Sequence, residues 1–127
     1  MPQIDCILAI DQGTTGTTSL TVSQNGSVLS RGYATVASTF PQDGWVEQDA
    51  EEIWQSVLSS VSEALANTEV RPIAIGIANQ RETTIIWDSD TGLALTPAIV
   101  WQCRRTAHRC KGLIEAGYAE FVRSRTG

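Results

Sequence analysis

The chain has 127 residues, 42% of them hydrophobic and 18% charged, a balance typical of a single globular domain. Its net charge of −5 leaves nine Lys and Arg residues scattered along the sequence, which excludes the basic face that nucleic acids and anionic membranes require. No apolar run approaches the ~20 residues of a membrane span, so we expect neither nucleic acid nor a membrane as a partner.

Cysteine usage indicates a reducing compartment. The three cysteines, Cys6, Cys103 and Cys110, are an odd number without a CxxC pair, which favours free thiols over a disulfide frame or a metal site. The N-terminal residues show neither the basic segment nor the apolar core of a signal peptide. We therefore expect a cytoplasmic protein.

The first predicted element is a strand followed by a turn rich in glycine and threonine, residues 6–18 (CILAIDQGTTGTT). Its five leading apolar residues, 6–10, are too few for a core helix and predict a strand buried on both faces. The strand ends on Asp11, a carboxylate that is costly there unless a cation meets it. The glycines and threonines after it can turn amide and hydroxyl donors toward a ligand.

These features predict a phosphate-binding turn in which Asp11 holds a magnesium ion, directly or through water. The turn lacks the Gly-Lys-Ser/Thr ending of a P-loop, and it lacks the glycine spacing and the following helix of a dinucleotide-binding fold. It resembles the phosphate hairpin of the actin, Hsp70 and sugar-kinase ATPases. A tight hairpin that binds no ligand is the alternative.

Two more strands are expected to complete an antiparallel meander. Residues 20–23 alternate apolar and polar side chains, as in a half-buried strand. The pair Asn25-Gly26 favours a type I′ hairpin turn, and a strand over 28–36 is expected to return from it. Residues 37–48 are then expected to form a loop.

A crossover helix is expected over residues 49–67. Asp49 is its predicted N-cap, and Glu52 completes a capping box. Apolar residues recur at helical spacing along this segment, and they are Ala50, Ile53, Trp54, Val57, Leu58, Val61, Ala64 and Leu65. The stripe predicts a helix packed on a sheet, with Trp54 in the core.

A second apolar run, 73–78, predicts another buried strand after the break at Arg71-Pro72. A strand, a crossover helix and a second buried strand imply parallel pairing. The order β-β-β-α-β is that of the ribonuclease H-like, or actin-like ATPase, fold, an α/β architecture with a mixed sheet. Strands over 83–87 and 93–101 around a turn at 88–92, a helix from about 104 to Gly117, and the start of another helix in 118–127 are expected to follow.

The segment 76–84 (GIANQRETT) places Arg81 and Glu82 just past the end of a predicted strand, where open α/β sheets collect their ligands. The glutamate can accept hydrogen bonds from two neighbouring hydroxyls, and the arginine can donate to the same oxygens. This chemistry suits a small polyol. A surface ion pair is the alternative for this dipeptide taken alone.

Four motifs follow one another along the chain and carry a more specific resemblance. They are residues 11–15 (DQGTT), 40–47 (FPQDGWVE), 79–84 (NQRETT) and 100–106 (VWQCRRT). Together they resemble the N-terminal part of the FGGY carbohydrate kinases, in particular of the members that act on glycerol. The resemblance covers the whole chain.

The resemblance implies transfer of the ATP γ-phosphoryl group to a terminal hydroxyl of glycerol, giving sn-glycerol 3-phosphate, with Mg²⁺ as cofactor. It assigns the magnesium to Asp11, the glycerol hydroxyls to Arg81 and Glu82, and the carbon side of the substrate to Trp101. The residues it places around the nucleotide phosphates are Asp11, Gly13, Thr14, Thr15 and Gly16. From the residues alone, a tryptophan on an apolar return strand is more often part of the core.

Two departures from the family pattern matter. Thr18 stands where the family commonly has an arginine, so one cationic contact to the nucleotide is absent or comes from elsewhere. The family's general-base aspartate and adenosine-binding lobe are expected beyond residue 127, and a kinase needs both walls of its cleft. We therefore expect residues 1–127 to be a truncated N-terminal part of the FGGY N-terminal domain, inactive alone, with the phosphate hairpin at 6–23, the crossover helix at 49–67 and the substrate segment at 76–106.

The full-length enzyme is expected to be a homo-oligomer with glycerol and ATP as its small-molecule substrates. Two alternatives stay open at this point. One is another FGGY kinase that acts on a pentose or a longer polyol. The other is a non-catalytic binding module derived from such a kinase.

Overall fold

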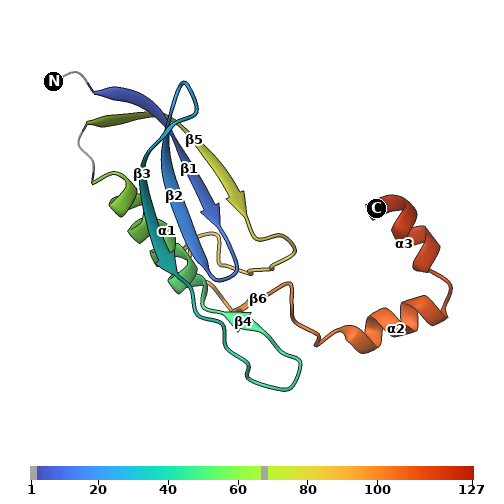
Figure 1. The fold of residues 1–127 in the computed structure, drawn as a ribbon. Coiled ribbons are helices and arrows are strands. Elements are labelled where there is room, and N and C mark those ends of the chain that lie inside the picture. Colours follow the sequence, from blue (N-terminus) through green and yellow to red (C-terminus); the bar gives the residue numbers. More distant parts are fainter. Residues whose placement is uncertain (1–2, 67–68) are drawn as a thin grey trace.

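A four-stranded mixed sheet forms the centre of the computed structural model, which describes residues 3–66 and 69–127 (Figure 1). The strands are β1 (Ile4–Gln12), β2 (Gly16–Ser23), β3 (Val28–Thr35) and β5 (Val70–Asn79), in the spatial order β3-β2-β1-β5. The first three strands pair antiparallel, and β5 lies parallel to β1 after a crossover through helix α1 (Ala50–Ala64). The predicted β-β-β-α-β order and the mixed α/β sheet are confirmed.

The hairpin between β2 and β3 differs from the predicted type I′ turn. That turn needs a positive φ at both central residues, but of the turn residues only Gly26 has one, at 86°. The Gly26 amide donates to the Ser23 carbonyl, and the Ser23 amide donates to the Ser27 carbonyl, both at 2.9 Å. The connection is therefore a three-residue loop with a glycine in the left-handed position.

Helix α1 packs on β2 and β3 mainly through small side chains, so the predicted apolar stripe is confirmed only in part: Ala64 is buried, whereas Leu58 is 42% exposed. Its buried face includes Ser56 and Ser60, whereas Trp54, predicted to lie in the core, is 54% exposed. The Ser56 hydroxyl pairs with that of Thr17 at 2.6 Å, and the Ser60 hydroxyl pairs with that of Ser19 at 2.8 Å. Because these hydroxyls satisfy one another, they can be buried at little cost.

The small contact face lets the helix approach β3 closely at Gly32. A Cβ atom added there would lie 2.0 Å from the carbonyl oxygen of Ser60 and 2.8 Å from the amide nitrogen of Ala64. These are backbone atoms of a regular helix, which can only move if the helix moves. Gly32 is therefore required by packing.

We predict that Gly32→Ala lowers the melting temperature of the 127-residue chain by roughly 4–12 °C. Overpacking of this kind costs about 1–3 kcal/mol, and each kcal/mol corresponds to about 4 °C in a domain of this size. Thermal unfolding followed by circular dichroism measures the shift. Gly76→Ala on β5 is the matched control, because a Cβ there meets nothing within 4 Å. Equal melting temperatures for the two variants would contradict the close packing.

Asp49 caps α1 as predicted. Its Oδ1 accepts a hydrogen bond from the backbone amide of Glu51 at 2.8 Å, and the acidic side chains of the first turn suit the positive end of the helix. The cap bond goes to Glu51, so the capping box expected with Glu52 was wrong. The regular helix ends at Ala64, and residue 67, its predicted end, lies outside the described residues.

The prediction that β1 and β5 are buried on both faces was also wrong. On β1 the side chains of Cys6, Leu8 and Ile10 are buried, whereas Ile7 between them is 47% exposed. On β5 every residue after Val70 is exposed. Because α1 lies over β2 and β3, no helix in the described part of the chain covers β5 (Figure 1).

The predicted strands after β5 are replaced by short, irregular pairings. Residues 83–87 and 93–101 contribute two isolated bridges, Thr84 with Ile99 and Trp87 with Ala94. They also contribute β6 (Ala98–Ile99), which pairs antiparallel with β4 (Glu47–Gln48). Strand β4 lies in the segment 37–48 that was expected to be loop throughout. This pairing joins that segment to residues 98–99.

The turn at 88–92 is present, and one carboxylate organises it. The Asp88 Oδ1 accepts hydrogen bonds from the amide of Thr91 at 2.8 Å and from the amide of Asp90 at 3.0 Å. These bonds, with that from the Thr91 hydroxyl, hold the pKa of the Asp88 carboxyl below its ordinary value. The turn is therefore fixed by local hydrogen bonds rather than by packing.

Two helices, α2 (Ala107–Glu115) and α3 (Ala119–Thr126), follow and extend away from the sheet (Figure 1). Helix α2 begins three residues later than predicted. Gly117, with a φ of 85°, ends it as predicted, and the Tyr118 amide donates to the Leu113 carbonyl at 3.0 Å. No helix in the described residues is long and apolar enough to cross a membrane.

Candidate functional site

The carboxyl ends of β1 and β5 border a cavity of about 370 Å³, here called the strand-end cavity. Its lining residues are Asp11, Gly13, Thr14, Asn79, Gln80, Arg81, Glu82 and Trp101. The parallel register places Asp11 beside Ala78 and Gln12 beside Asn79, so the segments that follow the two strands emerge at the same edge of the sheet. The predicted phosphate turn, the predicted polyol segment and Trp101 therefore share one cavity.

Two predicted phosphate residues, Thr15 and Gly16, lie outside this lining. Gly16 is buried against β3, where a Cβ atom would lie 2.5 Å from the carbonyl oxygen of Ala34. Its own carbonyl accepts a hydrogen bond from the Gly13 amide at 2.8 Å. The Thr15 side chain is exposed. Close packing against β3 thus explains why position 16 is a glycine. A phosphate contact of Thr15 or Gly16 stays a prediction.

Trp101 borders the cavity and is 53% exposed. Its indole Nε1 donates to the Thr14 hydroxyl at 2.9 Å, and its backbone amide donates to the Thr83 hydroxyl at 3.3 Å. These bonds attach it to the phosphate turn and to the polyol segment at once. Within the described residues Trp101 is therefore not part of the core, and its contact with substrate stays a prediction.

The three charged groups of the cavity are Asp11, Arg81 and Glu82, and all three are exposed. Within the part of the chain that the structure describes, none of them forms an ion pair, so the surface pair between Arg81 and Glu82 is not formed. Glu82 also has a φ of 59°. Few non-glycine residues adopt this conformation, and those that do are often held there at functional sites.

Asp11 is the candidate metal ligand. In nucleotide sites Mg²⁺ is usually bound by one or two carboxylates, while water and substrate phosphates complete its shell. An exposed, unpaired carboxylate at the cavity fits this pattern. The described residues hold no group of three His, Cys, Asp or Glu side chains that could enclose an ion by itself. Thr18 lies opposite Asp11 in the β1–β2 register, so an arginine at position 18 would have been its neighbour.

A cluster around Arg105 was not predicted from the sequence. The Arg105 Nη2 lies 2.7 Å from the Glu47 Oε1, and its guanidinium lies 3.8 Å from the ring centre of Trp45. The Arg105 Nε also donates to the Cys103 Sγ at 2.9 Å. Burial favours the neutral thiol, but hydrogen bonds from the Arg105 side chain and from the backbone of Arg105 and Val46, together with the Arg105 charge, lower the pKa of Cys103 below its ordinary value. The cluster joins residues 45–47 to residues 103–105, which belong to two of the four motifs.

Sequence reasoning also missed three glutamines, Gln12, Gln48 and Gln80, whose side chains meet beside the strand-end cavity. Each stands at the end of a strand or directly after one. Gln12 and Gln80 stand shortly after the apolar runs of β1 and β5, but no sequence pattern links either of them to Gln48. The cysteines, by contrast, are free thiols as predicted.

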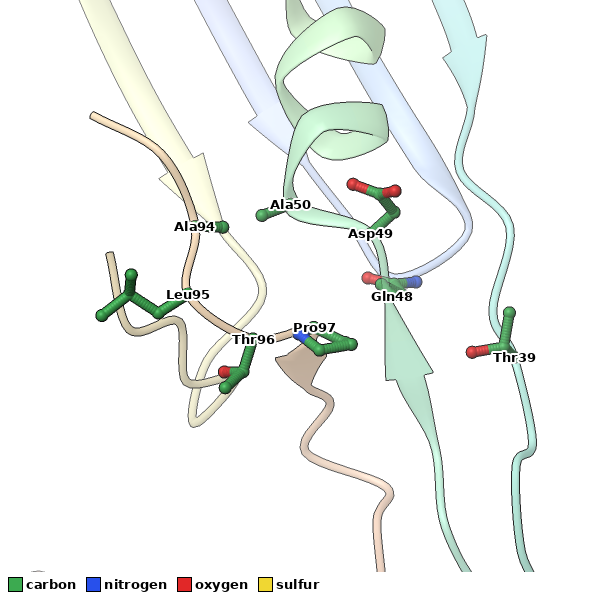
Figure 2. Close-up of a pocket in the computed structure, with 8 residues that line it drawn as sticks. All are labelled: Thr39, Gln48, Asp49, Ala50, Ala94, Leu95, Thr96 and Pro97. Atoms are coloured by element: carbon green, nitrogen blue, oxygen red, sulfur yellow. The ribbon is translucent and has the colours of Figure 1, made fainter. Parts of the chain in front are cut away.

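A larger cavity, of about 430 Å³, lies at the N-terminal end of α1 (Figure 2). Its lining residues are Thr39, Gln48, Asp49, Ala50, Ala94, Leu95, Thr96 and Pro97. The carboxylate of Asp49 already accepts the cap bond of the helix, and the rest of the lining carries no charge. The strand-end cavity, with three charged groups that form no ion pair within the described residues, is therefore the candidate functional site.

Comparison with known proteins gives close relatives. Residues 6–127 match the N-terminal domain of the FGGY family of carbohydrate kinases. The chain is 50% identical over 124 residues to the glycerol kinase of Koribacter versatilis and 46% identical over 124 residues to glycerol kinase 2 of Thermotoga maritima. Each match covers 95% of this chain and 25% of the relative. The chain thus spans about a quarter of the length of these relatives.

Solved structures share the fold. The crystal structure of Plasmodium falciparum glycerol kinase with ADP matches with a TM-score of 0.81 at 30% identity, over 89% of this chain and 23% of that one. The gluconate kinase of Lactobacillus acidophilus matches with a TM-score of 0.86 at 21% identity, over 94% of this chain and 24% of that one. The second likeness concerns the fold alone. Both agree with the predicted actin-like ATPase architecture.

Proposed function

Because the chain belongs to the FGGY family of carbohydrate kinases, we propose that it is the N-terminal part of a longer enzyme that phosphorylates glycerol with ATP. The proposed product is sn-glycerol 3-phosphate. Relatives named glycerol kinases are 44% to 50% identical to this chain over 124 residues. This similarity favours glycerol as the substrate.

The observation that carries the proposal is the meeting of two unlike binding groups in the strand-end cavity. On the β1 side, Asp11 and the Thr14 hydroxyl suit a phosphate chain with its magnesium ion. On the β5 side, Arg81 and Glu82 offer a donor and an acceptor to neighbouring hydroxyls. Phosphoryl transfer depends mainly on holding donor and acceptor in one place, so this juxtaposition supports a polyol kinase.

Each group has a proposed role in positioning the reactants. Glu82 accepts hydrogen bonds from two glycerol hydroxyls, and Arg81 donates to the same oxygens. The Thr14 hydroxyl, which accepts from the Trp101 indole, still has its own proton to donate to a phosphate oxygen. The Trp101 ring covers the carbon side of the polyol. When bound at Asp11, Mg²⁺ neutralises charge on the phosphate oxygens.

Two alternatives are separable by experiment. A kinase for a pentose or a longer polyol would prefer that substrate over glycerol when a panel is assayed on the full-length enzyme. A non-catalytic module would bind glycerol or nucleotide without releasing ADP. The proposed function requires glycerol-dependent ADP release with glycerol as the preferred substrate.

We predict that Glu82→Gln raises the glycerol KM of the full-length enzyme at least tenfold and leaves its ATP KM close to wild type. The substitution keeps the shape but removes a charged acceptor, a loss of roughly 1.5–3 kcal/mol in binding. Steady-state kinetics with each substrate varied in turn measures both constants.

The matched control is Glu115→Gln, since that carboxylate is exposed on α2 and lies 3.8 Å from Lys111. It should change neither KM. An unchanged glycerol KM in Glu82→Gln would mean that Glu82 does not hold the polyol, and the proposed substrate role of this segment would be wrong.

A further inference from the structure

Three glutamine side chains link the two sides of the strand-end cavity. The Gln80 Nε2 donates to the Gln12 Oε1 at 3.2 Å and to the Gln48 Oε1 at 2.9 Å. Gln12 is 8% exposed and Gln48 is fully buried, while Gln80 lines the cavity. We call these three residues the glutamine cluster.

Two backbone carbonyls of the phosphate turn set the direction of the hydrogen bonds in this cluster. The Gln48 Nε2 donates to the carbonyl oxygen of Thr14 at 2.6 Å. The Gln12 Nε2 donates to the carbonyl oxygen of Gly13 at 2.8 Å. Since a carbonyl can only accept, the amide oxygens of both glutamines are left to face Gln80, which must present its NH₂ group to them. Each bond thus has one possible direction.

The remaining acceptor of Gln80 holds the polyol segment. Its Oε1 accepts from the Thr83 hydroxyl at 2.9 Å, so this bond spans Arg81 and Glu82. Between its two ends Glu82 has the positive φ of 59°, a strained conformation for a non-glycine residue that persists only where the surrounding structure holds it. The backbone amide of Gln80 also donates to the Gln12 carbonyl at 2.7 Å. The cluster therefore supports the conformation that presents Glu82.

We propose that Gln80 is a positioning residue that makes ligand binding at the phosphate turn and at the polyol segment interdependent. The proposal rests on the proposed function and adds a coupling between its two ligands. The Gly13 and Thr14 carbonyls of the phosphate turn hold Gln12 and Gln48, so a nucleotide that fixes this turn also fixes the hydrogen bonds to Gln80 and, through them, the backbone at Glu82. A ligand at either end therefore favours the arrangement of the cluster that suits the other ligand. The second ligand then binds more tightly, in either order of addition.

Calorimetric titration of the full-length enzyme tests this coupling. The dissociation constant of glycerol is measured alone and with saturating Mg²⁺ and the β,γ-imido analogue of ATP. In wild type we expect the analogue to tighten glycerol binding at least about fivefold, the lower end of typical coupling between sites. In Gln80→Leu, which keeps most of the volume but removes the amide, the ratio of the two constants should fall close to one.

Thr83→Val is the second variant, because it is nearly isosteric and removes the hydroxyl that donates to Gln80 and accepts from the Trp101 amide. In Thr83→Val the ratio of the two glycerol dissociation constants should also fall close to one. This variant tests the coupling even if Gln80→Leu folds poorly. Gln55→Leu is the matched control, since that amide donates to Glu51 on the exposed side of α1 at 2.8 Å. It should keep the wild-type ratio.

The outcomes separate this proposal from the one on which it rests. A wild-type enzyme that binds no glycerol overturns the proposed function, and the coupling with it. An enzyme that binds glycerol with a ratio of one overturns the coupling alone. So does a lower melting temperature in Gln80→Leu and Thr83→Val with an unchanged ratio, because the cluster would then only stabilise the fold. The coupling is supported if the ratio falls close to one in both variants and keeps its wild-type value in the control.

Discussion

Asp11→Asn should lower the kcat of the full-length enzyme by at least about 10²-fold, because metal-assisted charge stabilisation contributes several kcal/mol to phosphoryl transfer. Asparagine is nearly isosteric with aspartate but lacks the negative charge that attracts Mg²⁺. Asp11 is exposed and forms no ion pair within the described residues. The free energy of unfolding should therefore change by less than about 0.5 kcal/mol.

The measurement pairs kcat over a magnesium titration with the melting temperature of the same variant. The variant should need more magnesium to reach its lower maximal rate. Asp43→Asn, in the exposed part of the segment 37–48, is the matched control and should behave as wild type. Near-full activity of Asp11→Asn would refute the metal assignment, and unfolding of the variant would make Asp11 a structural residue.

The order and direction of the four sheet strands and of α1 could be predicted because local patterns determine them. Apolar runs at 6–10 and 73–78 flank a helix with a recognisable cap at Asp49, and a strand–helix–strand unit of this kind implies a parallel pair. Parallel pairing brings the ends of both strands to one edge of the sheet. The meeting of Asp11 with Arg81 followed from that topology, without knowledge of any side-chain contact.

Burial could not be predicted in the same way, because a side chain's exposure depends on which other element covers it. Ile75 and Ile77 have the composition of a core strand, yet they are 63% and 71% exposed. On α1 the large Trp54 lies beside the contact with the sheet, and Ser56 and Ser60 form it. An apolar pattern indicates which residues favour burial. It does not indicate which other element of the structure covers them.

The glutamine cluster could not be predicted because its members are far apart in the sequence. Gln80 is 68 residues from Gln12 and 32 residues from Gln48. No periodicity or spacing marks such a polar contact, which exists only once the strands have paired. The positive φ of Glu82 could likewise not be predicted from the residue type, because glutamate rarely adopts it.

Large apolar side chains are exposed on β5, on residues 85–95 and on the two C-terminal helices. They include Ile73, Ile75, Ile77, Ile86, Trp87, Leu93, Leu95, Ile114 and Phe121. Proteins that work as free monomers rarely expose so much apolar surface. In the proposed full-length enzyme, we expect further chain to cover these residues and to add the second wall of the strand-end cavity.

The 127-residue chain alone should therefore release no ADP in response to glycerol. Its cavity offers groups for the phosphates and the polyol, but Asp11 and Glu82 already have proposed binding roles and leave no carboxylate of this lining to act as general base. An open cavity also leaves water in the site and the reactants poorly aligned. A coupled ADP-release assay with ATP, Mg²⁺ and glycerol measures this, with the full-length enzyme as the positive control. Glycerol-dependent turnover of the chain at ordinary kinase rates, about 1–100 s⁻¹, would show that the strand-end cavity is a complete active site.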